Sequence, residues 1–211
     1  ILKPLIDNLA TRKGLGKLVG KVGMSAAVPG LGLVPMTAEM QTTLLVKLPH
    51  EINRKMDRDL KAMGVGEKTR KTFLTSPYFT TGQRLIFMSQ LRKLKHVENR
   101  AAVVAVASRA ECEADALATN DELRMLIDID RKQKIVRLED AGVPTAVLAG
   151  GTCIAVYSAD FLLATDDVSA MRADIRRRHP TTPALLMCSG RVSPAVRRLF
   201  SDMSISTTEL R

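Results

Sequence analysis

The chain of 211 residues is 45% hydrophobic and 26% charged, which is the balance of a globular protein and excludes a disordered one. It holds no Trp, two Tyr and five Phe, so recognition of nucleic-acid bases by aromatic stacking is not expected. Its net charge of +10 resides in residues 1–99, with 17 Lys and Arg against 7 Asp and Glu, because residues 100–211 hold 15 of each kind.

The N-terminal segment, residues 1–36, is rich in Gly, basic and apolar. Lys13, Lys17 and Lys21 recur every fourth residue and would share one face of a helix. Such a segment can lie on a membrane surface or pack closely on another helix. The alternative is a helix or loop, loosened by its glycines, on the body of the protein. Pro35 then predicts a linker.

Apolar residues at helical spacing predict that residues 37–132 form a helical region, and Thr37 is the expected N-cap of its first helix. The expected helices cover residues 37–48, 51–63, 67–74, 81–94 and 97–132. In the helix over 81–94, Arg84 is expected on the exposed side. In the longest helix a break is expected near Thr119 and Asn120. Residues 101–107 are apolar on nearly every side and should lie at the centre of the helices.

After Lys134 the pattern changes to short runs of β-branched residues. The expected strands cover residues 135–138, 145–149, 152–157, 184–188 and 204–208. The Gly-Gly pair at 150–151 predicts a hairpin between the second and the third of them. Two further helices are expected to begin at Thr165 or Asp166 and at Ser193-Pro194. We therefore expect an α+β fold, mainly helical at first and followed by a small α/β unit over residues 133–211.

Neither a metal site, a cofactor site nor a membrane span is expected. The cysteines lack C-x-x-C spacing and the histidines lack an H-x-x-x-H partner; they are Cys112, Cys153, Cys188, His50, His96 and His179. One bridge between Cys153 and Cys188 is left open. No apolar run approaches the roughly 20 residues that span a bilayer. A cytoplasmic protein is expected, although the start at Ile1 leaves a removed signal segment open.

The stretch Cys188-Ser189-Gly190-Arg191 lies between a predicted strand and a predicted helix, where a helix N-terminus and Arg191 would lower the pKa of a thiol. It resembles the active-site loop of rhodanese sulfurtransferases, although it is one residue shorter than that loop. The resemblance implies a thiol-dependent enzyme in which Cys188 is the nucleophile and Arg191 stabilises an anion. The other interpretation is a buried structural cysteine beside an exposed arginine.

Residues 185–210 are also similar to the last βαβ portion of flagellar and injectisome export-gate cytoplasmic domains, where a strand, a Ser-Pro cap and an Arg-rich helix recur. This resemblance is local, because the helical half before it does not match. It therefore implies an arrangement of elements and assigns no functional residue.

The charge asymmetry predicts that the basic half meets an anionic partner, although a basic surface can also serve solubility alone. The first hypothesis is a non-enzymatic binding or assembly module for a nucleic-acid backbone, an acidic protein or an anionic membrane surface, with self-association left open. The thiol-dependent enzyme is the alternative. On a membrane, contacts are expected from Lys13, Lys17 and Lys21. On phosphates, they are expected from Arg54, Arg58, Lys61, Lys68, Arg70, Lys71, Arg92, Lys93 and Lys95.

Overall fold

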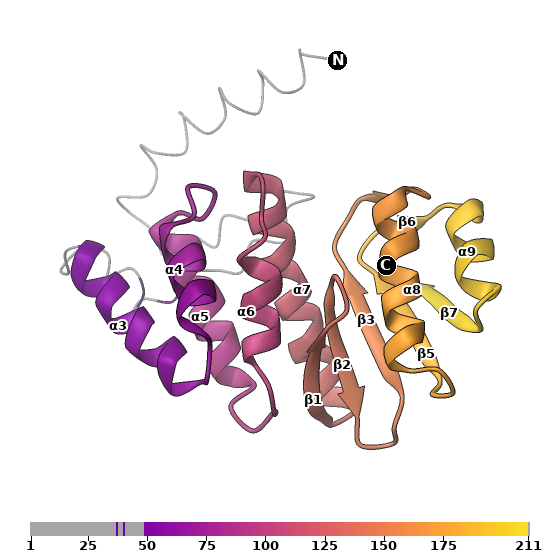
Figure 1. Ribbon diagram of the computed structural model, residues 1–211, viewed down its shortest axis with the longest axis horizontal. Coiled ribbons are helices and arrows are strands. Elements are labelled where there is room, and N and C mark those ends of the chain that lie inside the picture. The colour runs from indigo at the N-terminus through magenta and orange to yellow at the C-terminus, as the bar shows by residue number, and fades with distance from the viewer. Residues whose placement is uncertain (1–36, 38–39, 41–48, 211) are drawn as a thin grey trace, which may run out of the picture. The chain divides into compact units, whose positions relative to one another are not determined.

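The computed structural model describes Thr37, Met40 and residues 49–210, all of which belong to one compact unit (Figure 1). The expected helix over 37–48 and the segment with Lys13, Lys17 and Lys21 therefore lie mostly or wholly outside the described residues. The backbone N–H of Met40 donates to Oγ1 of Thr37 at 3.4 Å, which is the N-cap interaction expected for Thr37.

Helices precede strands along the chain, so the expected α+β class is confirmed. The first five described helices are α3 (Pro49–Ala62), α4 (Glu67–Thr75), α5 (Thr81–Lys93), α6 (Ala101–Ala107) and α7 (Glu113–Lys132). Thr80 begins α5 with a capping box, in which its hydroxyl accepts from Gln83 and the Gln83 side chain accepts from Thr80. The first three helices lie close to the predicted ranges because their apolar spacing is regular.

The prediction of one helical run over 97–132, interrupted near Thr119 and Asn120, is wrong: the interruption lies earlier, after Ala107. The chain leaves the helix after Ala107 and enters α7 at Glu113, where Oδ2 of Asp115 accepts the backbone N–H groups of Glu111 and Cys112 at 2.8 and 3.1 Å. Thr119 and Asn120 do not interrupt α7. Their side chains donate to the carbonyls four residues earlier, at 2.8 and 3.1 Å, and stay within the helical path.

Five strands form the main sheet in the order β1-β2-β3-β5-β7. Their bounds are β1 (Ile135–Asp140), β2 (Pro144–Leu148), β3 (Cys153–Tyr157), β5 (Ala184–Cys188) and β7 (Ile205–Glu209). β1, β2 and β3 run antiparallel, with the predicted hairpin at 150–151, and β3, β5 and β7 run parallel. Two short strands that were not predicted, β4 (Phe161–Leu162) and β6 (Arg191–Val192), pair with each other.

Helices cover both faces of the sheet (Figure 1). Ile154 and Val156 of β3 face the core that includes α6 and α7, whereas Cys153 and Ala155 face the core that includes α8 (Asp166–Arg178) and α9 (Pro194–Ser201). The helical region and the sheet thus share one of the two cores. As predicted, α6 lies among other elements, and Val103 and Val104 are fully buried. The hydroxyls of Thr165 and Ser193 cap α8 and α9.

The two edges of the sheet differ. Along β1, Glu98 pairs with the outer edge: its N–H donates to the carbonyl of Val136 at 2.9 Å, and its carbonyl accepts from Leu138 at 3.0 Å. β7 is the strand at the opposite edge. None of the helices that the structure describes is long and apolar enough to cross a membrane.

Candidate anion-binding face

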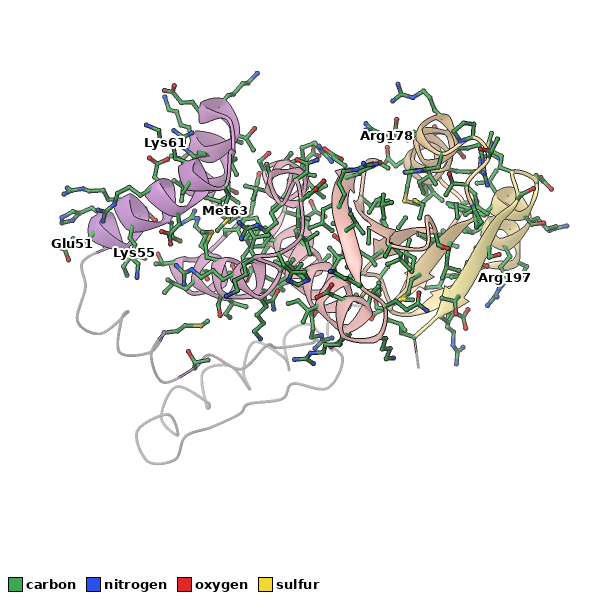
Figure 2. The ribbon with its side chains drawn as sticks, turned by 90° about the horizontal axis from the view of Figure 1, so that it is seen from below. Glu51, Lys55, Lys61, Met63, Arg178 and Arg197 are labelled. Atoms are coloured by element: carbon green, nitrogen blue, oxygen red, sulfur yellow. The ribbon has the colours of Figure 1, made fainter. Side chains whose placement is uncertain are left out.

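The outward side of α3 carries a row of cations. Ile52, Met56 and Leu60 are at most 3% exposed and form the inward side of the helix. On the opposite side, Arg54, Lys55, Arg58 and Lys61 are exposed. We call these four residues the α3 stripe. Figure 2 shows Lys55 and Lys61 on α3 at the helical end of the molecule, with Arg178 and Arg197 at the sheet end.

Two of the three carboxylates of α3 bind arginines of the neighbouring helices, whereas the third, Glu51, is exposed in the first turn, one turn before Lys55. Nε of Arg70 on α4 lies 2.8 Å from Asp57, and Nη2 of Arg92 on α5 lies 2.5 Å from Asp59. Arg70 also donates to the carbonyl of Val65 at 2.8 Å. Two of the nine arginines and lysines expected to bind phosphate therefore hold three helices together. Their pairing therefore offsets two of the three acids of α3, Asp57 and Asp59, but not Glu51.

The other lysines of the expected set lie on the elements that flank α3. Lys68 and Lys71 are exposed on α4, Lys93 is exposed at the end of α5, and Lys95 is exposed just beyond it. Within the described residues, none of these four lysines and none of the α3 stripe forms an ion pair. The helical end therefore keeps eight exposed cations without a carboxylate partner in the part of the chain that is described.

In residues 100–211, the neutral half of the chain, arginines form ion pairs with carboxylates of the same half. Its ion pairs join Arg109 to Asp140, Arg124 to Asp121, Arg131 to Asp128, Arg137 to Glu139, Arg177 and Arg178 to Asp174, and Arg197 to Glu209. No carboxylate of this half pairs with the α3 stripe or the four flanking lysines in the described structure. Folding therefore preserves the asymmetry of charge that the sequence shows.

The expectation that Arg84 lies on the exposed side of its helix is wrong. Its side chain is buried, with Nε 3.3 Å from the carbonyl oxygen of Phe73 and Nη2 2.5 Å from that of Ser76. The last carbonyl groups of a helix have no hydrogen-bond donor within the helix, and at the end of α4 the guanidinium group of Arg84 is that donor. Burial lowers the pKa of Arg84 from its ordinary value. This arginine serves the packing of α5 on α4 and is not available to a ligand.

Cys188 lies at the end of β5 and is fully buried. Burial raises the pKa of its thiol, and hydrogen bonding with the backbone of Gly190 and Ala159 offsets only part of that rise. Arg191 is exposed on β6. A reactive thiol needs exposure and a lowered pKa, so this arrangement gives the thiol-dependent alternative no support. The bridge left open between Cys153 and Cys188 is not formed, since both are free.

A cleft of about 340 Å³ lies between the α3–α4 connection, α6 and the end of β1. Its charged lining consists of Glu139, Asp140 and Arg178. Each is already engaged, because Glu139 binds Arg137 and His179, Asp140 binds Arg109, and Arg178 binds Asp174. The cleft therefore offers a ligand less available charge than the α3 stripe does.

Two buried polar groups lie outside every expected site. Glu122 on α7 is only 6% exposed, and burial raises its pKa to about 8. His179, at the end of α8, is buried with Nε2 3.0 Å from Oε2 of Glu139. Periodicity could place Glu122 on the inward side of a helix, but the contact of His179 with a strand 40 residues earlier has no local signal. No group of three or more metal-ligating side chains occurs among the described residues.

No family model, no curated protein and no solved structure matches this chain.

Proposed function

We propose that this chain is a non-enzymatic binding module whose helical end binds the phosphate backbone of a nucleic acid. The observation that carries the proposal is the α3 stripe, four exposed cations on one helix, where Arg70 and Arg92 bind two of the three acids of that helix. The exposed lysines of α4 and α5 add charge on both sides of it. Such a surface attracts a polyanion and releases the counterions bound to it.

The composition of this surface favours phosphate over a folded acidic protein. Protein interfaces are organised around buried aromatic or aliphatic anchors. Among the described residues, the large exposed apolar side chains are Tyr78, Val136, Phe161, Leu163 and Leu210; none of them lies on α3, α4 or α5, and Tyr78 lies in the turn between α4 and α5. Arginine and lysine side chains can bind phosphate oxygens without such an anchor.

The length of the stripe also fits this partner. From Arg54 to Lys61 the helix rises about 10 Å, over which one strand of a duplex presents about three phosphates. Because no exposed aromatic side chain lies on these helices, contacts go to the backbone and not to the faces of the bases. We therefore expect weak preference for sequence and strong dependence on salt.

The test is the binding of the full chain to a labelled DNA duplex and to a labelled RNA hairpin, measured by fluorescence anisotropy over a range of salt concentrations. A variant with Arg54→Glu, Arg58→Glu and Lys61→Glu should lose at least about tenfold in affinity and show a salt slope smaller by about 2 to 3. The matched control reverses three exposed cations of the sheet end, with Arg177→Glu, Arg191→Glu and Arg198→Glu, and has the same change of net charge.

The control variant should bind within about twofold of the unchanged chain, since these residues lie outside the proposed surface. Equal losses in the two variants would show that only net charge matters and would overturn the proposal. So would affinity that does not change with salt. Binding to vesicles with anionic lipids but not to either nucleic acid would assign the surface to a membrane, and binding to polyglutamate alone would assign it to an acidic protein.

A further inference from the structure

In the part of the chain that the structure describes, the outer edge of β7 is an open sheet edge. Leu210 donates its backbone N–H to the carbonyl of Cys188 at 2.8 Å, so Leu210 directs its backbone groups toward β5. Successive residues of a strand direct these groups to opposite sides, and therefore Thr208 and Ser206 also face β5, whereas Ile205, Thr207 and Glu209 face outward. Within the described residues, no backbone hydrogen bond reaches the outward N–H and carbonyl groups of Ile205 and Thr207.

This edge lacks most of the devices with which proteins usually block a free strand, although β7 is short and carries Glu209. β7 contains neither Lys nor Pro, and its ladder with β5 has a continuous register with no bulge. The other edge of the sheet is protected, because Glu98 pairs along β1 and the β1–β2 register shifts between Ile135 and Arg137. Among the described residues, β7 is therefore the edge at which a further strand can pair with the sheet.

We propose that two copies of this chain pair through β7, antiparallel about a twofold axis that passes beside Thr207. In this register the two Thr207 residues face each other and exchange both of their outward backbone hydrogen bonds. Ser206 of one copy then lies opposite Thr208 of the other, and pairs of hydroxyl-bearing residues across antiparallel strands are favourable. The five-stranded sheets of the two copies become one continuous sheet.

Charge is compatible with a second copy in this register. The one charged residue of β7 is Glu209, which lies opposite Ile205 of the other copy and not opposite its own counterpart. Its carboxylate is also engaged on one face of the sheet, where it accepts the backbone N–H of Val192 at 2.8 Å and binds Arg197. Like charges therefore do not oppose each other along the shared edge.

The proposal predicts that the full chain is a dimer, measured by sedimentation velocity up to about 100 µM, where a dimer with micromolar affinity is almost fully formed. Thr207→Lys places two ammonium groups against each other at the axis and should raise the dissociation constant at least about tenfold. Thr208→Lys is the matched control, because its side chain lies on the other face and opposes Ser206. It should leave the association nearly unchanged.

Disulfide cross-linking tests the register. With the exposed Cys112 replaced in a Cys112→Ser background, Thr207→Cys should form a covalent dimer on mild oxidation, because opposite residues of an antiparallel pair lie within disulfide distance. Ser206→Cys should not. A monomer for the unchanged chain at all concentrations would overturn the proposal. Cross-linking through Ser206→Cys alone, or equal weakening by the two lysine variants, would do so as well.

Discussion

Glu122 and Ser158 join α7 to the end of β3, because Oε1 of Glu122 accepts the backbone N–H of Ser158 at 3.2 Å. The carboxyl group is buried, and no cation among the described residues pairs with it. Burial raises its pKa to about 8, and the nearby charges of Asp121 and Asp115 act in the same direction, against the hydrogen bond from Ser158. Glu122 is therefore mostly protonated in the folded protein at neutral pH.

The stability of the fold should fall as the pH rises from about 4.5 to about 8. The folded protein holds a proton on Glu122 that the unfolded chain releases near the ordinary pKa of glutamate, so unfolding releases a proton in this interval and is favoured by higher pH. Glu122→Gln keeps the acceptor for Ser158 and removes the titration. We expect the free energy of unfolding of the variant to fall less steeply with pH, and to exceed that of the unchanged chain at pH 8 by a few kcal/mol.

The measurement is chemical denaturation of both proteins between pH 5 and pH 8. At pH 5 the two should differ little, because Glu122 is then neutral in the folded state of the unchanged chain. Glu111→Gln, at an exposed carboxylate, is the control and should follow the unchanged chain throughout. Parallel pH profiles for Glu122→Gln and the unchanged chain would show that Glu122 is charged when folded.

The sequence predicts those elements of the fold whose signals are local. The strands around the 150–151 hairpin and the caps of α8 follow from β-branched runs and from Thr165, and the structure confirms them. The break after Ala107 is different, because it depends on Asp115, a side chain that caps α7 from within its first turn. The two-residue strands β4 and β6 exist only because the fold brings them together, and so no local pattern indicates them.

Only part of the candidate site could be predicted from the sequence. The exposed side of α3 follows from the spacing of Ile52, Met56 and Leu60, which fixes where Arg54 and Arg58 lie. The pairing of α3 with the arginines of α4 and α5 depends on how three helices pack, and the composition of each helix does not specify it. Arg84 was misplaced for the same reason, since its carbonyl partners belong to the preceding helix and the turn after it.

Glu139 should stabilise the contact between β1 and the end of α8. Burial alone would raise its pKa, but hydrogen bonds from Arg137 and the charge of His179 outweigh that effect and lower it. Glu139→Gln should cost about 1 to 2 kcal/mol at pH 7, because Arg137 and the buried His179 lose their charged partner. A group with a lowered pKa stabilises the folded state above its ordinary pKa and loses this contribution as the pH falls.

Denaturation of this variant and the unchanged chain at pH 7 and at successively lower pH checks the expectation for Glu139. The difference between them should close as the pH falls below the ordinary pKa of a glutamate. If the difference in the free energy of unfolding persists in acid, the packing of the side chain, and not the charge of Glu139, accounts for the loss of stability.

Gly190 should contribute to the stability of the sheet end, because the backbone packs closely against it. A Cβ at this position would lie 2.3 Å from the carbonyl oxygens of both Ala159 and Asp160, and backbone atoms cannot move away as a flexible side chain can. Gly190→Ala should therefore destabilise the fold by about 2 to 3 kcal/mol. Gly150→Ala is the matched control, because a Cβ there meets no atom within 4 Å. It should change stability by less than about 1 kcal/mol, and equal effects of the two substitutions in thermal unfolding would contradict the close packing at Gly190.

The three cysteine thiols should differ in their reactivity toward iodoacetamide, and this difference tests the thiol-dependent alternative. Cys112 is exposed, whereas Cys153 and Cys188 are buried, and burial raises the pKa of Cys153 to about 12 and also raises that of Cys188. Iodoacetamide at pH 8 should therefore add one label to the native chain, at Cys112, and three in denaturant, as counted by mass spectrometry. Cys112→Ser should take up none while folded. Rapid labelling of Cys188 in the folded Cys112→Ser variant would instead mean that the thiol is accessible as a thiolate, and would favour the thiol-dependent alternative over the binding module.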